Sequence, residues 1–417
     1  MFWGNEFSAL EEWLLQKVYD AVGRPPVRLM LRSGASVSPT TDTPLANIVV
    51  GDLNTLMRMV IDPEVGFGDA YREGRVTVEG DLVAAVENVM RCMTQANHRS
   101  WYARLISKGM EYLQRNSLHG SRENIHHHYD LGTDFYRLWL DRDLVYTCAY
   151  FPSPSATLEE AQTAKLDYVC RKLHLQPGER VVEAGCGWGA LALYMAKHYG
   201  VSVRAFNISH AQILEARRRA KEGGLAQQVE FVEDDYRNIS GRYDAFVSVG
   251  MLEHVGREHY RELSRVIQRS LTETGRGFLH FIGRNQPRAF SRWTRKRIFP
   301  GAYVPPLSQV MKILEPGDFA VLDVENLRLH YAKTLEHWLA RFEESRHRVL
   351  QMFDPEFVRA WRLYLAGSIA GFRVGTLQLF QVLFARNACG QIPWTRSHLY
   401  KQERVEPEET RWLTATS

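Results

Sequence analysis

The chain has 417 residues, 45% of them hydrophobic and 24% charged, which is typical of a folded globular protein with about two or three domains. Aromatic residues make up 11% of the chain and exclude extensive disorder. The formal net charge of +4, from 52 Lys and Arg against 48 Asp and Glu, is too small to indicate a nucleic-acid partner.

Neither a membrane span nor a secretory signal is indicated. No apolar stretch approaches the roughly 18 residues of a transmembrane helix. Residues 1–8 lack the basic region and apolar core of a signal peptide. We therefore expect a cytoplasmic protein. The five cysteines are widely scattered and form no C-x-x-C pair, so their spacing indicates neither a disulfide framework nor a zinc site.

The first hundred residues predict a small α+β unit without a catalytic constellation. An opening helix is marked by one apolar face and ended by Arg24-Pro25-Pro26. Strands are expected at 27–31 and 48–50, and helices at 52–61, with Asp52 as the N-cap, and from 81 to about 96. The apolar face of the first helix is expected to hold Phe7, Leu10, Trp13, Leu14 and Val18. We interpret residues 1–115 as a docking or dimerisation domain that ends in a polar helix from about 100 to 115.

From Asn124 onward, helix and strand patterns alternate, which predicts a parallel sheet. Thr157 and Glu160 form a capping box that opens a helix reaching about Leu173. The expected strands are 180–184, 201–206, 229–232, 245–249 and 277–282, with a closing pair at 318–324 and 377–384 and helices at 190–198, 335–352 and 355–370. The fold class is therefore α/β, a doubly wound sheet spanning 116–395, followed by a polar tail at 396–417.

A glycine-rich loop is the strongest local signal. The strand at 180–184 runs into Gly185-Cys186-Gly187-Trp188-Gly189 and then a helix, so backbone N–H groups can approach a ligand closely. The spacing differs from the G-x-G-x-x-G of dinucleotide sites. The preceding Glu183 would repel a pyrophosphate but suits a cationic ligand such as S-adenosylmethionine (SAM). The alternative is a glycine turn that serves helix–sheet packing.

Two further strand ends carry polar side chains that would meet the same ligand. Asn207 follows the second strand, with Gln212 one turn into the next helix, and Asp235 follows the third. A nucleoside binds along the carboxyl ends of such strands. A dinucleotide fold would place an acidic residue where Asn207 stands. For Asp235 the alternative is a helix N-cap.

Five motifs in order resemble those of the cyclopropane-fatty-acyl-phospholipid synthases, over about residues 124–386. The resemblance implies the class I methyltransferase fold behind a small N-terminal domain, and a SAM enzyme that acts on the double bond of a membrane lipid's acyl chain. The motifs begin at His128 (HYDLG), Tyr146 (YTCAYF), Glu183 (EAGCGWG), Val249 (VGMLEHVG) and Phe278 (FLHFIG).

The resemblance also implies two sets of site residues. The SAM contacts would be Tyr146, Thr147, Gly185, Gly187, Gln212 and Asp235, with Tyr129 on a segment that closes over the cofactor. A bicarbonate ion beside the reacting carbon would be held by Cys148, Glu253, His280, the Ile282 backbone and Tyr331. The further partners implied are an unsaturated phospholipid, the inner face of the membrane, which the protein would contact peripherally, and a second copy of the chain in a homodimer.

The chemistry explains these residue types. An isolated alkene is a weak nucleophile, so a sulfonium methyl must be held in line with it in a dry site. Methyl transfer leaves a carbocation whose protons are acidic enough for a weak base such as bicarbonate. The faces of Tyr331 and Phe281 are expected to stabilise the cation.

Departures from the family pattern leave the product open. Glu183 stands where Asp is usual, Thr147 where Ser is common, and Thr133 where Asn is usual. Ring formation, a methyl- or methylene-branched chain and small-molecule N-methylation all remain possible outcomes.

Each proposed catalytic side chain has a purely structural alternative. Cys148 fits a small buried residue, Glu253 a helix N-terminus, His280 a core histidine and Tyr331 simple packing. Three adjacent histidines, 126–128, cannot all face one ion, and no metal is predicted.

A basic stretch, residues 284–300, holds six Lys and Arg, interleaved with aromatic residues and free of acidic ones. It directly follows the motif that contains His280. We expect it to dock phospholipid headgroups. The alternative is a solvated helix face.

Overall fold

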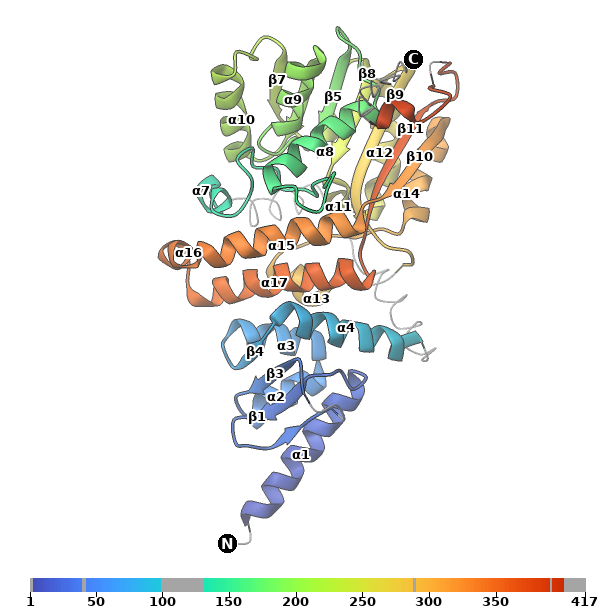
Figure 1. The fold of residues 1–417 in the computed structure, drawn as a ribbon. Coiled ribbons are helices and arrows are strands. Elements are labelled where there is room, and N and C mark those ends of the chain that lie inside the picture. The colour runs from blue at the N-terminus through green and yellow to red at the C-terminus, as the bar shows by residue number, and fades with distance from the viewer. Residues whose placement is uncertain (1–2, 40–42, 99–130, 288–289, 391, 401–417) are drawn as a thin grey trace, which may run out of the picture.

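The computed structural model describes residues 3–39, 43–98, 131–287, 290–390 and 392–400. Two sheets lie toward opposite ends of an elongated molecule (Figure 1). Between them lies a helical layer made of α15 (Arg328–Glu344), α16 (Arg346–Met352) and α17 (Pro355–Val374). Within the described ranges, no helix has both the length and the apolar character needed to cross a bilayer.

The smaller sheet has four strands in the order β2-β1-β3-β4, with β1 parallel to β3 and the other pairs antiparallel. Asp52 caps α2 as predicted, because its carboxylate accepts from the Thr55 N–H at 2.7 Å. The elements of this unit are α1 (Trp3–Ala21), β1 (Arg28–Leu31), β2 (Ser36–Val37), β3 (Ala46–Val50), α2 (Leu53–Ile61), α3 (Pro63–Arg72), β4 (Val76–Gly80) and α4 (Leu82–His98).

The expected apolar face of the first helix is partly wrong. Trp13 is 56% exposed and Leu10 46%, whereas Leu14 and Leu15 are buried. The buried stripe is centred one to two residues further along, where Leu15 and Tyr19 share a face at i, i+4 spacing.

The larger sheet confirms the predicted doubly wound α/β fold. Its seven strands have the order β10-β11-β9-β8-β5-β6-β7. The five from β9 to β7 run parallel, whereas β11 is antiparallel to both β9 and β10. The strands are β5 (Arg180–Ala184), β6 (Ser202–Asn207), β7 (Val229–Glu233), β8 (Tyr243–Val249), β9 (Leu271–Gly283), β10 (Phe319–Asn326) and β11 (Gln378–Arg386).

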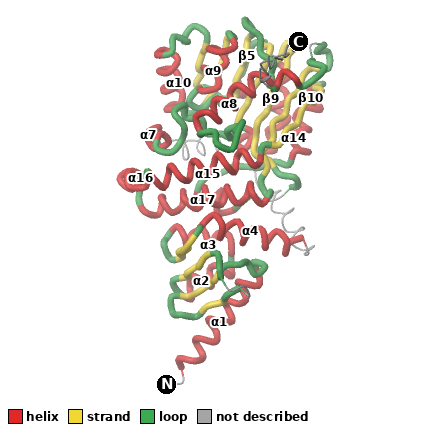
Figure 2. Tube along the Cα trace, in the orientation of Figure 1, coloured by secondary structure: helices red, strands yellow, loops and turns green. Residues whose placement is uncertain are grey.

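Helices cover both faces of this sheet (Figure 2). The predicted capping box of α8 is present, with Thr157 and Glu160 bonded reciprocally. The remaining helices are α7 (Thr133–Arg137), α8 (Leu158–Lys172), α9 (Ala190–Tyr199), α10 (His210–Glu222), α11 (Leu252–Val255), α12 (Tyr260–Ser270), α13 (Arg292–Arg297) and α14 (Leu307–Leu314), with short 3₁₀ turns η1 (Tyr236–Asn238), η2 (Arg257–His259), η3 (Glu315–Gly317) and η4 (Ser397–Leu399).

The helix expected at 335–352 starts earlier and is divided. It begins at Arg328, whose N–H is capped by the Asn326 side chain at 3.0 Å. It breaks at Ser345, whose hydroxyl donates to the Leu138 carbonyl at 3.0 Å. The earlier start places Tyr331 on a helix. The predicted domain boundary near 115 and the polar helix before it lie outside the described residues, so the division into 1–115 and 116–395 stays a prediction.

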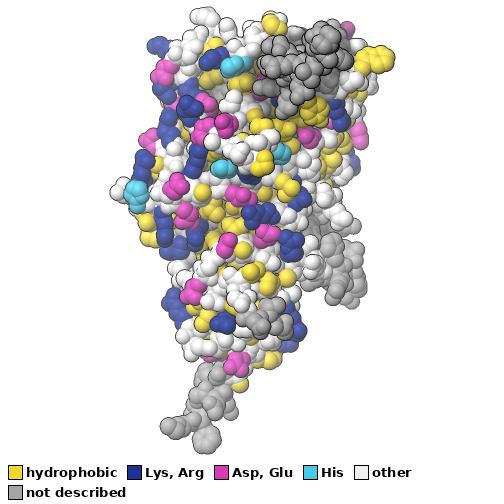
Figure 3. Space-filling view, viewed as in Figure 1, with side chains coloured by type: hydrophobic (Ala, Val, Ile, Leu, Met, Phe, Trp, Pro, Cys, Tyr) yellow, Lys and Arg dark blue, Asp and Glu magenta, His cyan; other side chains and the backbone are white. Residues whose placement is uncertain are grey.

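Ion pairs join the N-terminal unit to the rest of the molecule. Arg297 binds Asp69 of α3 through two hydrogen bonds of 2.8 and 2.9 Å. Lys296 lies 3.4 Å from the same carboxylate, and Arg292 lies 2.9 Å from Asp62. Much of the basic stretch is therefore neutralised within the fold. On the face shown in Figure 3, Lys and Arg are likewise intermixed with Asp and Glu.

Close packing between α3 and α13 generates a test of this junction. A Cβ at Gly68 would lie 2.4 Å from the ring of the buried Trp293. Gly68→Ala should therefore force the two helices apart and lower the unfolding free energy by about 1–3 kcal/mol. Thermal denaturation monitored by circular dichroism measures the effect.

The matched control is a helix glycine with open space around it. A Cβ at Gly367 of α17 would meet nothing within 4 Å, so Gly367→Ala should raise stability by about 0.5–1 kcal/mol. Equal melting temperatures for Gly68→Ala and the parent protein would contradict the close packing.

Candidate active site

The glycine loop after β5 has the geometry that close backbone approach requires. Gly185, Gly187 and Gly189 all have positive φ, at 86°, 53° and 83°. A Cβ at Gly189 would lie 2.5 Å from the Phe231 ring, so this glycine packs the following helix against the sheet. By contrast, a Cβ at Gly187 would meet nothing within 4 Å. The loop therefore serves packing at one end and leaves space for a ligand in its middle.

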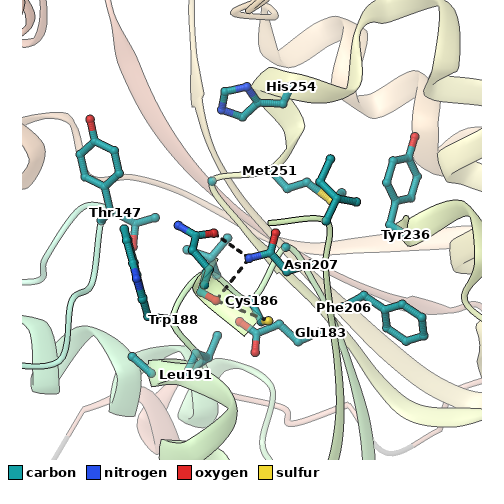
Figure 4. Close-up of a pocket in the computed structure, with 18 of the residues that line it drawn as sticks. Thr147, Glu183, Cys186, Trp188, Leu191, Phe206, Asn207, Tyr236, Met251 and His254 are labelled. Atoms are coloured by element: carbon teal, nitrogen blue, oxygen red, sulfur yellow. Dashed lines mark hydrogen bonds between the residues drawn. The ribbon is translucent and has the colours of Figure 1, made fainter. Parts of the chain in front are cut away.

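A cavity of about 150 Å³ lies beside this loop, at the carboxyl ends of β5, β6 and β8. Figure 4 shows side chains from several elements converging on it, with Trp188 and Thr147 on one side and Tyr236 on the other. Of the predicted cofactor residues, those that line this cavity are Tyr146, Thr147, Glu183, Gly185, Gly187, Asn207, Gln212 and Asp235. Tyr129 lies outside the described residues.

Hydrogen bonds fix the polar groups of this cavity. The Asn207 amide donates to the Gln212 side chain at 2.7 Å and to the Gly187 carbonyl at 3.3 Å, as drawn in Figure 4. One carboxylate oxygen of Asp235 accepts from the Arg237 N–H at 2.9 Å. Asp235 is thus both the cap of η1, which was its structural alternative, and part of the cavity wall, whereas its contact with SAM stays a prediction.

Glu183 lies under the loop, where burial raises the pKa of its carboxyl to about 8. Its Oε2 atom has no hydrogen-bond partner among the described residues. The Lys165 ammonium in the same cavity wall lowers this pKa in part, and a cationic ligand would lower it further, because a nearby positive charge offsets the loss of hydration.

A second, larger cavity of about 540 Å³ lies between the N-terminal unit and helices α15 and α17. Its walls are mainly apolar and include Met59, Phe67 and Met90 from the first unit and Leu363 and Phe372 from the second. Four residues line both cavities: Tyr146, Thr147, Gly250 and His254. The two cavities therefore meet at a shared wall.

Three of the predicted catalytic residues line the larger cavity, namely Glu253, Ile282 and Tyr331. The Ile282 N–H donates to Glu253 Oε1 at 2.6 Å. Burial raises the pKa of Glu253 to about 7. The Tyr331 ring packs against Phe372, with ring centroids 4.7 Å apart.

His280 and Cys148 lie behind the cavity wall rather than on it. His280 Nδ1 is 3.1 Å from the Gln381 amide nitrogen. Because an NH₂ group can only donate, this bond leaves the imidazole proton on Nε2, which has no partner among the described residues. Burial holds the His280 pKa well below its usual value.

Cys148 and Phe281 have no direct access to either cavity among the described residues. Cys148 is fully buried, and its thiol donates to the Ala149 carbonyl at 3.2 Å. Burial raises its pKa, so the thiol stays protonated. Phe281 points to the opposite side of β9, where it packs with Phe380, so the expectation that it faces a cation is wrong.

The sequence interpretation missed several lining residues. His254 follows Glu253 directly, and burial lowers its pKa to about 4, so its imidazole is neutral. Tyr364, whose hydroxyl lies 3.1 Å from that of Tyr146, comes from 218 residues further along the chain. Lys165, a buried lysine of α8, also lines the smaller cavity. Only the adjacency of His254 to Glu253 offered a signal.

No group of three His, Cys, Asp or Glu side chains is placed to hold a metal ion within the part of the chain that is described. The histidines at 126–128 lie outside that part.

Strand order, glycine loop and strand-end polar residues together define a SAM-dependent methyltransferase of the class I, Rossmann-like type.

Comparison with known proteins narrows this class. The model of the mycolic acid cyclopropane synthetase family matches residues 116–382, and the chain belongs to that family. It is 34% identical over 390 residues to a probable fatty acid methyltransferase of Pseudomonas putida, covering 90% of this chain and 96% of that one. It is 33% identical over 366 residues to the cyclopropane-fatty-acyl-phospholipid synthase of Escherichia coli, covering 86% and 92%.

A solved structure shows the same relationship. The mycolic acid cyclopropane synthase CmaA1, complexed with SAH and CTAB, superposes with a TM-score of 0.61 at 29% identity, over 65% of this chain and 99% of that one. The chain is thus a SAM-dependent enzyme of a family that modifies fatty acyl chains by cyclopropanation or methyl branching.

The burial of Glu253 predicts a pH-dependent stability difference. The pKa of Glu253 in the folded protein is about 7, which is higher than the ordinary value of 4.5. The protonated side chain therefore favours the folded state fully below pH 4.5, and this contribution to stability is lost as the pH rises through 7. Glu253→Gln should therefore stabilise the protein at pH 8, by up to about 3 kcal/mol, and much less at pH 5. Urea unfolding of both proteins at the two pH values tests this, and an equal difference at both would contradict it.

Proposed function

We propose that the protein transfers a methylene unit from SAM to the cis double bond of an unsaturated phospholipid acyl chain and forms a cyclopropane ring. The observation that carries the proposal is the meeting of the two cavities. The smaller one has the polar groups and carboxylates that suit SAM, and the larger one is apolar and lies across a wall of four residues.

The larger cavity suits an acyl chain. Its apolar walls stabilise hydrocarbon by the hydrophobic effect, and few of its groups compete for hydrogen bonds. SAM supplies an electrophilic sulfonium methyl. The shared wall would bring this methyl against the alkene while Tyr146 and Tyr331 exclude water, which a weak alkene nucleophile requires. The Tyr331 face is available to stabilise the carbocation.

Bicarbonate is part of the proposal. The residues fit a small anion, because the buried Nε2–H of His280 is a donor and Glu253 Oε2 can accept, and neither atom has a partner among the described residues. The Ile282 N–H already donates to Glu253 Oε1, and the Cys148 thiol donates to the Ala149 carbonyl, so in this arrangement neither group points a hydrogen at the ion. When bound, bicarbonate would supply a weak base for the proton of the new methyl group, which lets the ring close.

A second product class is a methyl- or methylene-branched chain. The observation that favours it is the similarity to a probable fatty acid methyltransferase over 90% of the chain. The same cavities would serve both reactions, and only the fate of the carbocation would differ.

We also propose peripheral association with the inner face of the membrane. Three of the basic residues thought to dock headgroups, Arg292, Lys296 and Arg297, pair with acids of the N-terminal unit. Arg284 of the same stretch lines the larger cavity, is largely buried, and lies over the Phe290 ring at 5.6 Å. The homodimer stays a prediction.

The deciding experiment is incubation with SAM and vesicles of unsaturated phospholipid, followed by proton NMR of the lipids. We expect upfield cyclopropane protons. Vinylic methylene protons, or a methyl branch on a retained double bond, without ring protons would support the second product class, because both form by loss of a proton from the carbocation. The absence of any lipid product would contradict both classes.

Two substitutions test the proposed catalytic residues. Glu253→Gln and His280→Ala should lower turnover by about a hundredfold or more, because each removes a group proposed to place the base. SAH binding, measured by calorimetry, should persist in both. Near-full turnover in either variant would falsify its assigned role.

The acyl cavity can be blocked without touching the cofactor cavity. Gly367 lines the larger cavity, and a side chain there would enter open space. Gly367→Trp should raise the KM for phospholipid vesicles about tenfold or abolish turnover, with SAH affinity retained, whereas Gly367→Ala should have a much smaller effect. Unchanged lipid kinetics in Gly367→Trp would show that the chain binds elsewhere.

A further inference from the structure

Lys165 of α8 is a buried cation in the wall of the cofactor cavity. Its side chain is 1% exposed, and its Nζ donates to the Thr147 hydroxyl at 3.0 Å. Thr147 belongs to the wall shared by the two cavities. No step of the proposed reaction uses this lysine, yet burying an ammonium is unfavourable unless it is paired.

The segment that Lys165 contacts is tied to α8 by a second side chain. Gln162, one turn earlier, donates to the Val145 carbonyl at 3.1 Å and to the Thr147 carbonyl at 2.8 Å. Asp141 accepts from the Val145 N–H at 2.9 Å. Residues 145–147 are thus supported by three buried polar side chains, of which Lys165 alone reaches a side chain of the shared wall.

The far side of Thr147 is equally confined. A Cβ at Gly250 would lie 2.8 Å from the Thr147 methyl, so this methyl packs directly on the backbone at the end of β8. Thr147 is therefore held between the Lys165 ammonium and Gly250. Without the hydrogen bond from Lys165, the Thr147 hydroxyl would lose its fixed orientation, and the Tyr146–Thr147 segment would be able to rotate.

Charges around Lys165 make its burial tolerable. Burial lowers its pKa to about 8, while the carboxylates of Asp141 and Glu183 act in the opposite direction. Glu183 lines the same cavity as the lysine. The lysine thus has acidic neighbours on the loop before α8 and on β5, which offset part of the cost of burying its ammonium.

We propose that Lys165 is a positioning residue for the cofactor: by holding the Thr147 hydroxyl, it fixes the Tyr146–Thr147 wall and thereby sets the affinity for SAM. The inference rests on the proposed placement of SAM in the smaller cavity. It concerns binding, so the lysine need not touch the reacting atoms.

Lys165→Met is the primary test, with SAH affinity measured by titration calorimetry and the KM for SAM measured in the vesicle assay. Because a hydrogen bond from a charged donor is lost, we expect the SAH Kd and the KM for SAM each to rise about tenfold or more. A folded Lys165→Met protein with the parent's SAH affinity would overturn the proposal.

Lys172→Met is the matched control. Lys172 lies on the same helix, is 2% exposed, and pairs with Asp323 at 3.1 Å and Glu325 at 2.6 Å, away from both cavities. It should lower the melting temperature but leave the SAH affinity unchanged. An equal loss of SAH affinity in both lysine variants would show that general destabilisation, not positioning, is responsible.

Thr147→Val extends the test should Lys165→Met fold poorly, since it removes the acceptor and keeps the methyl. We expect a similar loss of SAH affinity, and little further loss in the double variant, because both changes break one interaction. Fully additive losses would overturn the proposal. Parent protein that binds no SAH would overturn the SAM placement together with this inference, whereas normal parent binding with an unaffected lysine variant overturns the inference alone.

Discussion

Tyr146, Thr147, Gly250 and His254 form a wall between a small cavity that contains carboxyl and amide side chains and a larger, mainly apolar cavity. A sulfonium cofactor needs the first environment and a hydrocarbon chain needs the second, and the reacting atoms must still meet in van der Waals contact. Because the two cavities share these four residues, one boundary can serve both needs. The rest of the structure can be understood as support for it.

The support comes from three directions. Helix α8 holds the Tyr146–Thr147 segment through Gln162 and Lys165. The end of β8 brings Gly250 and α11 to the same place, because the β8–β9 pairing lets the Gly250 N–H donate to the His280 carbonyl at 2.8 Å. Helix α17 closes the apolar side through Tyr364. The N-terminal unit, joined by the ion pairs of Asp62 and Asp69, completes the apolar cavity.

Several ionisable groups in or near this wall are buried, although burial disfavours their charged forms. Burial raises the pKa of Glu183 and Glu253, and it lowers that of His254 and His280. In each case the charged form is less favourable, relative to the neutral form, than it would be in water. Such a concentration of perturbed groups in one place is typical of functional sites, where a ligand supplies the missing partner.

The sequence by itself determined which segments form the strands of the large sheet, the glycine loop, and the polar residues at the strand ends, because these depend on local periodicity and on turn chemistry. Motif resemblance also pointed to Glu253, Ile282 and Tyr331, which line the larger cavity, while their roles stay predictions. It misjudged Trp13 and Phe281, since a helix or strand pattern shows which residues share a face but not which face the neighbours cover.

Only the tertiary structure decided which partners the basic stretch contacts and where the larger apolar cavity lies. The acids that neutralise Arg292 and Arg297 are more than two hundred residues away in sequence, so local charge could not reveal them. The apolar cavity has walls from both ends of the chain, and Tyr364 and Lys165 gained their roles through contacts that packing alone brings about. Long-range proximity is a property of the folded chain, and no local pattern encodes it.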